Sequence, residues 1–331
     1  MIKLSKTIFL IFLLNNQIQA EQISDDTRLN TVREAQHTLT LNGGNCLELE
    51  AEFKNIRKWS ENTLKEENIS EPNCVCDKKF KKGRECKIDI DNVAPNIVKM
   101  YQDKTPKFNG PNCWNNTLVS TGILPHLRYS DPDEMEFWMK SPLCKEKKIT
   151  DKMEPGDAIA IRTNEGEYHG FIYISDKMSW SKNGYSKRSK YDLQTTENVF
   201  DVYKVPENCQ RITTDQEVPK ECTTFGNVYQ CRSWDDYWNE VKETANVDEE
   251  IDSKLNNIDC LTSKYVFGDI SPSPQTVSLI EASLDAIAFE VMDLKNKLTD
   301  KTPEAESIYV QRAVHRINSL KTQYELTSAY Y

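Results

Sequence analysis

The sequence predicts an α+β protein in which a short helix packs on a small antiparallel sheet. Three observations lead to this fold class. Residues 113–122 have a helical pattern, residues 158–182 contain strand-like segments separated by turns, and the last sixty residues repeat apolar side chains at helical spacing. We expect mostly helical, disulfide-stapled regions on either side of this core, ending in a C-terminal helical hairpin.

The first twenty residues predict the compartment. Lys3 and Lys6 precede an apolar run at 7–14, and the small residue Ala20 follows it. This pattern is typical of a secretory signal peptide and is too short for a membrane span. We therefore expect a secreted or periplasmic protein that does not insert stably in a membrane.

The charge of the chain argues against nucleic acid as a partner. The formal net charge is −10 at pH 7, and the Lys and Arg residues are scattered rather than clustered. A nucleic-acid-binding protein normally carries a basic patch that contacts phosphates. No such patch is visible in the sequence.

Ten cysteines in a secreted chain predict disulfides. All ten can pair, and Cys113 is then a disulfide cysteine. If Cys113 is instead a free thiol, at least one other cysteine is unpaired or bridges another chain. No metal site is expected among the cysteines at 46, 74, 76 and 86, because they contain no CxxC pair and the compartment is oxidising.

Composition and pattern divide the chain into five segments. They are the signal peptide (1–20), a cysteine-containing and mostly helical region (21–98), a region that carries the chemistry (99–206), a cysteine-containing linker (207–270) and a helical hairpin (271–331). In the second segment we expect helices at 26–38 and 46–65 and a turn region at 74–86.

The middle segment alternates helices and strands. The helix at 113–122 directs Trp114 and Leu118 inward and ends at Gly122. A second helix begins at Ser130-Asp131-Pro132, where a capping residue and a first-turn proline coincide. Strands are expected at 158–162, 170–175, 178–182 and 199–205. Residues 170–175 are apolar on both faces, so this strand is predicted to be central.

The last segment predicts two long helices. Apolar residues recur every three or four positions from Val277 to Leu298, and the pattern resumes from Val310 to Tyr324 after a turn at 299–303. We expect an antiparallel hairpin that packs on itself or on the body of the protein. Contact with another chain is the alternative.

Cys113 and His169 are the candidate nucleophile and base. Cys113 follows the turn Gly110-Pro111-Asn112 and opens a helix, and a helix N-terminus lowers the pKa of a thiol. His169 is one of four histidines and lies at a strand start, whereas His126 lies in a loop. Each residue alone has an ordinary explanation, a disulfide or buried thiol and a surface imidazole. Together they favour thiol catalysis.

These motifs resemble the NlpC/P60 and CHAP superfamily of papain-like cysteine peptidases and amidases, which cleave peptide crosslinks or stem amides in bacterial peptidoglycan. The resemblance is carried by residues 109–114, the turn Pro155-Gly156-Asp157 and residues 169–174, and it covers about residues 105–205. It implies a papain-like core, a peptidoglycan or other peptide substrate, and no cofactor or metal.

The resemblance also implies a third polar residue on the strand after the histidine. Asn183 matches the asparagine of the CHAP version, and Ser181 is the alternative; Asn183 can equally be a plain Asn-Gly turn residue. Candidates for the substrate groove are Asn112, Trp114 and Tyr168. The family's usual Asp-Cys-Ser-Gly string is replaced here by Asn-Cys-Trp-Asn.

The expected function is therefore a secreted cysteine hydrolase that cleaves amide bonds in the cell wall. Cys113 attacks the carbonyl, His169 transfers the proton, and Asn183 or Ser181 orients the imidazole. Two alternatives remain open from the sequence. One is a thiol acyl hydrolase or transferase with a different substrate, and the other is a non-enzymatic envelope or binding protein with the same fold.

Overall fold

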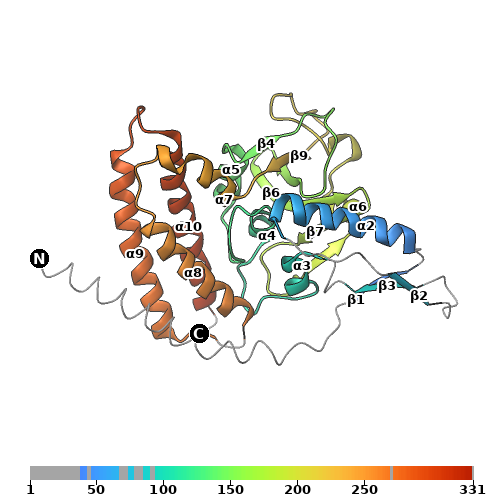
Figure 1. Ribbon diagram of the computed structural model, residues 1–331, viewed down its shortest axis with the longest axis horizontal. Helices are drawn as coiled ribbons and strands as arrows, with labels where there is room; N and C mark the ends of the chain where they lie inside the picture. The colour runs from blue at the N-terminus through green and yellow to red at the C-terminus, as the bar shows by residue number, and fades with distance from the viewer. Residues whose placement is uncertain are drawn as a thin grey trace, which may run out of the picture.

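The computed structural model describes residues 38–42, 46–66, 74–77, 85–89, 94–268 and 271–329. The protein is α+β, as predicted, with a group of helices at one end and a sheet with its own helices at the other (Figure 1). The predicted signal peptide and nearly all of the helix expected at 26–38 lie outside the described residues. Among the residues described, no helix combines the length and apolar character needed to cross a bilayer.

A six-stranded sheet forms the centre of the described structure. Its strand order is β4-β9-β5-β6-β7-β8, and all neighbouring strands are antiparallel. The strands are β4 (Cys144–Glu146), β5 (Ala158–Thr163), β6 (Gly166–Ser175), β7 (Met178–Lys182), β8 (Tyr191–Gln194) and β9 (Thr224–Cys231). Since β9 pairs with β5, the sheet includes residues beyond 206, the predicted end of the middle segment.

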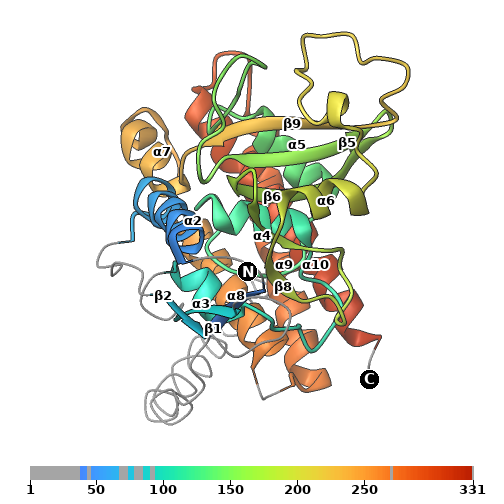
Figure 2. The ribbon, with the colours of Figure 1, turned by 90° about the vertical axis from the view of Figure 1, so that its right-hand side faces the viewer.

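The two faces of the sheet are covered by different helices. Ile172 and Ile174 pack in one apolar core with α2 (Cys46–Trp59), α4 (Cys113–Ser120) and α5 (Pro132–Lys140). Phe171 and Tyr173 point the other way, into a core with α6 (Thr196–Val202). Figure 2 shows α2 and α6 on opposite sides of β6. The central position predicted for this strand is confirmed.

The strand predicted at 199–205 is wrong, because these residues form most of α6 and the turn after it. The Thr195 hydroxyl accepts a hydrogen bond from Asn198 N and caps the helix. Val199 and Phe200 are adjacent positions on the buried side of α6. β-Branched and aromatic residues favour strands only weakly, and the cap together with the apolar core below outweighs that preference.

The N-terminal region contains strands as well as helix. The helix predicted at 46–65 is present as α2, which continues into a π-helical turn at Ser60–Leu64. The region expected to be turns at 74–86 contributes to a three-stranded sheet of order β1-β3-β2. Its strands are β1 (Thr38–Asn42), β2 (Cys74–Asp77) and β3 (Glu85–Asp89), and the short helix α3 (Asn96–Tyr101) follows.

The C-terminal hairpin is present and packs against a further helix. It consists of α9 (Pro274–Lys297) and α10 (Glu304–Ser328), joined by a turn at the predicted position. The segment expected to be a linker supplies β9, α7 (Trp234–Val241) and α8 (Glu250–Phe267), with single turns at Glu207–Cys209 and Lys242–Thr244. In Figure 1, α8 lies beside the hairpin.

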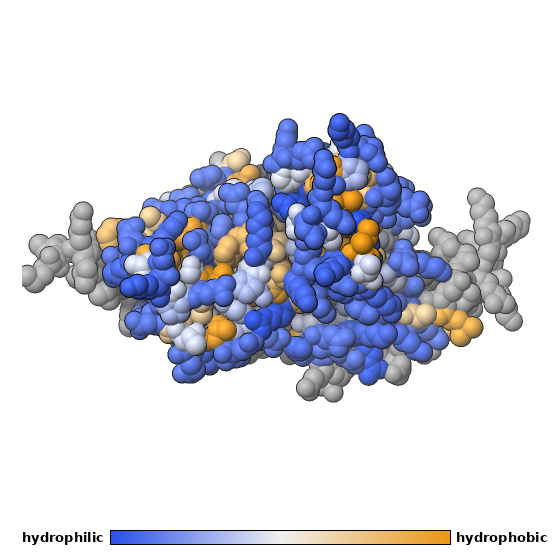
Figure 3. All heavy atoms as spheres, turned by 90° about the horizontal axis from the view of Figure 1, so that it is seen from above, coloured by the Kyte–Doolittle hydropathy of each residue, from blue (hydrophilic) through white to orange (hydrophobic). Residues whose placement is uncertain are grey.

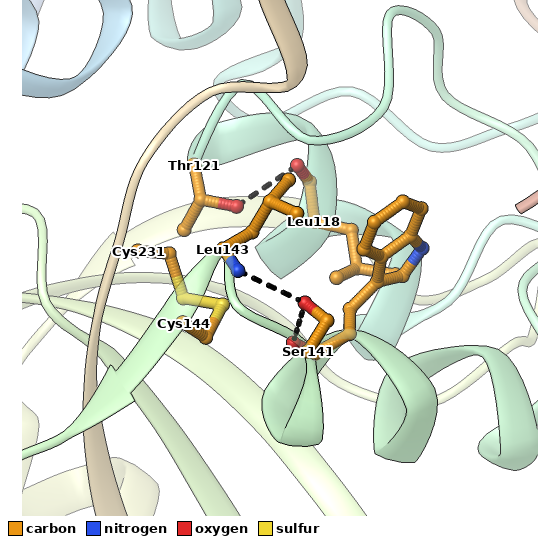
Figure 4. The surroundings of a disulfide bond; sticks show 7 residues. Leu118, Thr121, Ser141, Leu143, Cys144 and Cys231 are labelled. Atoms are coloured by element: carbon orange, nitrogen blue, oxygen red, sulfur yellow. Dashed lines mark hydrogen bonds between the residues drawn. A yellow bond between two sulfur atoms is a disulfide. The ribbon is translucent and has the colours of Figure 1, made fainter. Parts of the chain in front are cut away.

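The described cysteines include both disulfide partners and free thiols, which was one of the two alternatives that the cysteine count allowed. The described disulfides join Cys46 to Cys74, Cys144 to Cys231 and Cys209 to Cys222. Cys144–Cys231 ties β4 to β9 beside Leu118 and Thr121, at the end of α4 (Figure 4). Among the described cysteines, Cys113 and Cys260 are free. A free Cys113 was expected to leave a second unpaired cysteine, and that residue is Cys260.

Buried ion pairs join the helical end to α5 and the loop after α4. Arg128, in the loop after α4, donates to both carboxylate oxygens of Glu134 at 2.8 Å and to Asp259 of α8 at 2.8 Å. Arg316 of α10 also donates to Asp259. These four side chains are at most 1 % exposed. The outer surface in the view of Figure 3 is by contrast mostly hydrophilic, with small separate apolar patches.

Candidate functional site

Cys113 is the first residue of α4, and Asn112 fixes the start of this helix. The Asn112 side chain accepts a hydrogen bond from Asn115 N at 3.0 Å and donates one to Ser130 O at 2.7 Å. It is 2 % exposed. Asn112 was a candidate groove residue in the sequence. In the structure it is a buried N-cap, and both its side-chain oxygen and its side-chain nitrogen form hydrogen bonds within the protein.

The Cys113 thiol is buried among backbone N–H groups. Its residue is 3 % exposed, and burial raises the pKa of the thiol. The backbone N–H groups of Gly170, Trp114 and Gly184 and the Lys182 ammonium act in the opposite direction and favour the thiolate. Burial outweighs them in the resting protein, so the thiol is protonated there. These four groups stabilise the thiolate in any step that forms it.

His169 is fully buried and is held from the neighbouring strand. Its Nε2 shares a hydrogen bond of 3.1 Å with the hydroxyl of Ser181 on β7. The Tyr203 ring stacks on the imidazole with centroids 3.9 Å apart. Nδ1 is buried and has no hydrogen-bond partner among the described residues. Burial lowers the pKa of His169 to about 3, so the imidazole is neutral at physiological pH.

The Cys113 thiol contacts β6 at Gly170, the residue directly after His169, and does not bond to the imidazole. Side chains alternate along the strand, so His169 shares a face with Phe171, on which its ring also stacks. Gly170 faces α4, since an added Cβ there would lie 2.9 Å from Thr117 Oγ1. The Cys113 sulfur lies against the N–H of Gly170, the residue directly after His169. No hydrogen bond joins Nδ1 to the sulfur in the described structure.

Ser181, and not Asn183, contacts the imidazole. The sequence left these two residues open as alternatives for the orienting group. Asn183 follows the end of β7 and precedes Gly184, whose φ of 71° belongs to a turn. Its Oδ1 is buried and has no hydrogen-bond partner among the described residues. The turn-residue explanation of Asn183 thus describes its position best.

Lys182 is a charged residue beside Cys113 that the sequence analysis did not select. It is 0 % exposed, and its Nζ donates to the carbonyl oxygens of Gly184 at 2.9 Å and Ser186 at 3.2 Å. Burial lowers the pKa of Lys182 to about 8, and Cys113 opposes that shift. One signal was present in the sequence. Lys182 shares a strand face with Met178 and Trp180, which predicts burial for a residue type that is usually exposed.

Three aromatic residues next to His169, Cys113 and Gly184 in the chain keep part of their surface exposed. Tyr168 is 50 % exposed, and its ring meets the edge of Tyr203 with centroids 5.3 Å apart. Trp114 is half-buried. Tyr185, in the loop after β7, is 55 % exposed and was not selected from the sequence. Of the three groove candidates, Tyr168 and Trp114 are partly exposed and Asn112 is buried.

The other expected features of the region have structural roles. Asp157 accepts hydrogen bonds of 2.7 Å from Glu154 N and from Lys147 Nζ, as expected for a Pro-Gly-Asp turn. His126 is half-buried near Asp259 and Arg316 in the helical end. Across the described residues, no three His, Cys, Asp or Glu side chains are grouped so that they could hold a metal ion.

Comparison with known proteins gives no match: no family model, no curated protein and no solved structure is similar to this chain. The chemistry of the site must therefore be argued from its own residues.

Proposed function

We propose that this protein is a cysteine hydrolase of amide bonds with a papain-like core, in which Cys113 is the nucleophile and His169 the proton-transfer group. One observation carries the proposal. A free thiol opens a helix among three backbone N–H donors, one of them from Gly170, and the preceding residue on β6 carries a buried imidazole that Ser181 holds by Nε2. A nucleophile next to a base that is itself oriented by a third group is the arrangement that acyl transfer requires.

The proposed reaction is two-step acyl transfer. His169 Nδ1 takes the proton of the Cys113 thiol, the sulfur attacks the amide carbon, the C–N bond breaks, and the amine leaves with that proton. Water then attacks the thioester, so an amide and one water become a carboxylic acid and an amine. In this proposal the backbone N–H of Cys113, at the positive end of α4, donates to the oxyanion.

Peptidoglycan stem peptides are the substrate class that the sequence resemblance supports. The described disulfides agree with an oxidising compartment, where such a substrate is found. The half-exposed Tyr168 and Tyr185 offer flat apolar surfaces with hydroxyl groups beside the site, which suit a peptide backbone and its side chains.

Digestion of purified murein tests this function. Wild-type protein is compared with Cys113→Ala and with Cys260→Ala, since Cys260 is the other free cysteine described. We expect release of new amino and carboxyl termini by wild type and Cys260→Ala and none by Cys113→Ala. Full activity in Cys113→Ala rules out the proposed nucleophile. Parallel assays on protein amides and lipid esters show whether another acyl substrate is used instead.

A non-enzymatic binding protein is the second candidate. Cys113 is 3 % exposed, His169 is 0 % exposed, and no hydrogen bond joins them in the described structure. A binding role predicts that wild type and Cys113→Ala retain murein equally and that neither releases products. Sedimentation with insoluble murein followed by product analysis separates binding from cleavage.

A further inference from the structure

Lys182 is a buried cation close to the proposed nucleophile that the reaction described above does not use. The pairing of β6 with β7 places Ile172 opposite Trp180. Two residues further along an antiparallel pair, Lys182 comes opposite Gly170, whose N–H contacts the Cys113 sulfur. Both Gly170 and Lys182 therefore face α4, at the point where this helix begins.

Gly184 joins the lysine to the cysteine. Its N–H lies against the Cys113 sulfur, and its carbonyl oxygen accepts a hydrogen bond of 2.9 Å from Lys182 Nζ. The backbone of this one turn residue thus contacts both side chains. Because Gly184 has a φ of 71°, the turn is one that a residue with a Cβ adopts only at a cost.

The Lys182 ammonium has no carboxylate partner among the described residues. Its hydrogen bonds go to two neutral carbonyl groups, and the Tyr191 ring lies 5.7 Å from Nζ. A buried charge is costly unless an opposite charge or several strong hydrogen bonds compensate it. The acidic group that the lysine faces is the thiol of Cys113.

We propose that Lys182 is the positive partner of the Cys113 thiolate, so that the nucleophile is stabilised by an ammonium group rather than by an imidazolium. This inference rests on the proposed function. His169, buried beneath Tyr203, is neutral in the resting protein and carries the thiol proton only on its way to the leaving amine. Lys182 touches neither substrate nor leaving group and acts through Cys113, so it is a positioning residue.

Other titratable groups face Cys113 from every element packed around it. They are Lys182 of β7, Tyr191 of β8, Tyr203 after α6 and Tyr129 in the loop after α4, while His169 precedes Gly170 on β6. The tyrosines have raised pKa values because of burial and remain neutral near pH 7. The imidazole is neutral as well. Lys182 is the member of this set that carries charge near neutral pH.

The pH dependence of Cys113 alkylation tests the pairing. Iodoacetamide reacts with the thiolate and releases iodide, so its rate against pH reports the thiol pKa. We expect Lys182→Met and Lys182→Gln to raise that pKa by about one to three units, which is the effect of losing a close opposite charge. The alkylation rate at pH 7 then falls by about tenfold for each unit. Lys177→Met, at an exposed lysine between β6 and β7, leaves the profile unchanged.

The reciprocal measurement uses a variant that keeps Lys182. In lysine-labelled protein, the pKa of Lys182 is followed by NMR in wild type and in Cys113→Ala. Coupling between two groups is mutual, so removing the thiolate must lower the pKa of Lys182. The NMR measurement therefore tests the pairing even if Lys182→Met does not fold.

The outcomes distinguish this inference from the proposed function. An alkylation profile that is the same in Lys182→Met as in Lys177→Met overturns the pairing, even if murein is digested. So does a pKa of Lys182 that does not change in Cys113→Ala. A shifted profile in a protein that cleaves no amide supports the pairing and counts against the hydrolase.

Discussion

At the scale of single residues, the spacing of the site was predictable and its hydrogen bonds were not. The sequence selected Cys113 and His169 from motif order, and it named Ser181 and Asn183 as alternatives. Only strand register separates these two, because Ser181 lies within β7 on the face of His169 while Asn183 lies beyond its end. A residue that borders a turn has no fixed face in a period-two pattern.

Ser181 is predicted to matter for catalysis and Asn183 is not. Ser181→Ala removes the hydroxyl that holds His169 Nε2, so the imidazole loses its orientation. We expect kcat for murein cleavage to fall by about tenfold to a hundredfold, part of what a positioned general base contributes. Asn183→Ala, the matched control two residues away, changes kcat less than about twofold on the same argument. The reverse ranking contradicts the assignment of Ser181.

Lys182 shows why a buried charged residue beside Cys113 was not predicted from the sequence. Lysine is the residue type expected on a solvated surface, and its neighbours Ser181 and Asn183 drew attention by family resemblance. Its burial follows from the alternation of Met178, Trp180 and Lys182 on one face of β7. Side-chain alternation, applied up to the last residue of the strand, predicts that Lys182 is buried.

At the scale of elements, α10 supports the loop before the nucleophile. Gln323 of α10 accepts a hydrogen bond from Tyr129 N at 3.0 Å and donates one to Asn109 O at 3.1 Å. A Cβ added at Gly110 would lie 2.1 Å from Gln323 Oε1, so the loop and the helix are in close contact. The helical pattern of residues 310–324 was visible in the sequence. Its contact with a loop more than two hundred positions earlier was not, because no local pattern records which surface a helix covers.

Gln323→Leu tests this support. Two backbone groups lose their partners, and an unpaired buried polar group costs about 1–3 kcal/mol. We expect the free energy of unfolding in urea to fall by about 2 kcal/mol, whereas Glu325→Gln, at an exposed position of the same helix, leaves it nearly unchanged. Equal stability of the two variants contradicts a supporting role for Gln323.

The misplaced strand at 199–205 illustrates a limit at the same scale. Its residues include valines and aromatic side chains, which favour strands, but the helix cap at Thr195 begins four positions earlier. Short apolar segments satisfy both periods equally well, so tertiary packing decides. The long hairpin helices were easy to predict because their repeat continues over many turns.

At the scale of the whole molecule, a buried charge network joins α8 and α10 to α5 and the loop after α4. Asp259 of α8 accepts from Arg128 of the nucleophile region and from Arg316 of α10. The sequence divided these parts into separate segments, since charged residues scattered from Arg128 to Arg316 reveal no pairing. The described structure instead makes the C-terminal helices part of the scaffold beneath α4 and α5.

Asp259→Asn is predicted to destabilise the protein strongly. The two guanidinium groups lose a shared buried charge, and breaking a buried pair costs about 3–5 kcal/mol. Asp285→Asn provides the control, because Asp285 pairs with Lys321 at a surface position where it is 71 % exposed, and such pairs contribute at most about 1 kcal/mol. Chemical unfolding at pH 7 measures both. A loss no larger than that of the control contradicts the network.

Acidification should reduce the difference between wild type and Asp259→Asn. Burial opposes ionisation of Asp259, but Arg316 and Arg128 outweigh it and hold the pKa of Asp259 below its ordinary value. A carboxylate with a depressed folded-state pKa contributes stability above its ordinary pKa of about 4 and loses that contribution as the pH falls through the folded-state value. Unfolding experiments from pH 7 downward should therefore show wild type converging on the variant. A difference that grows on acidification contradicts this assignment.

Thiol labelling of the folded, unreduced protein tests the central claim most directly. An electrophile such as iodoacetamide is added near neutral pH, and the modified site is mapped by peptide mass spectrometry in wild type and in Cys113→Ala. The thiol chemistry proposed here predicts stoichiometric labelling of Cys113, faster than that of Cys260, together with loss of amide cleavage in the labelled protein. Labelling confined to Cys260, or full cleavage activity after Cys113 is modified, would contradict it.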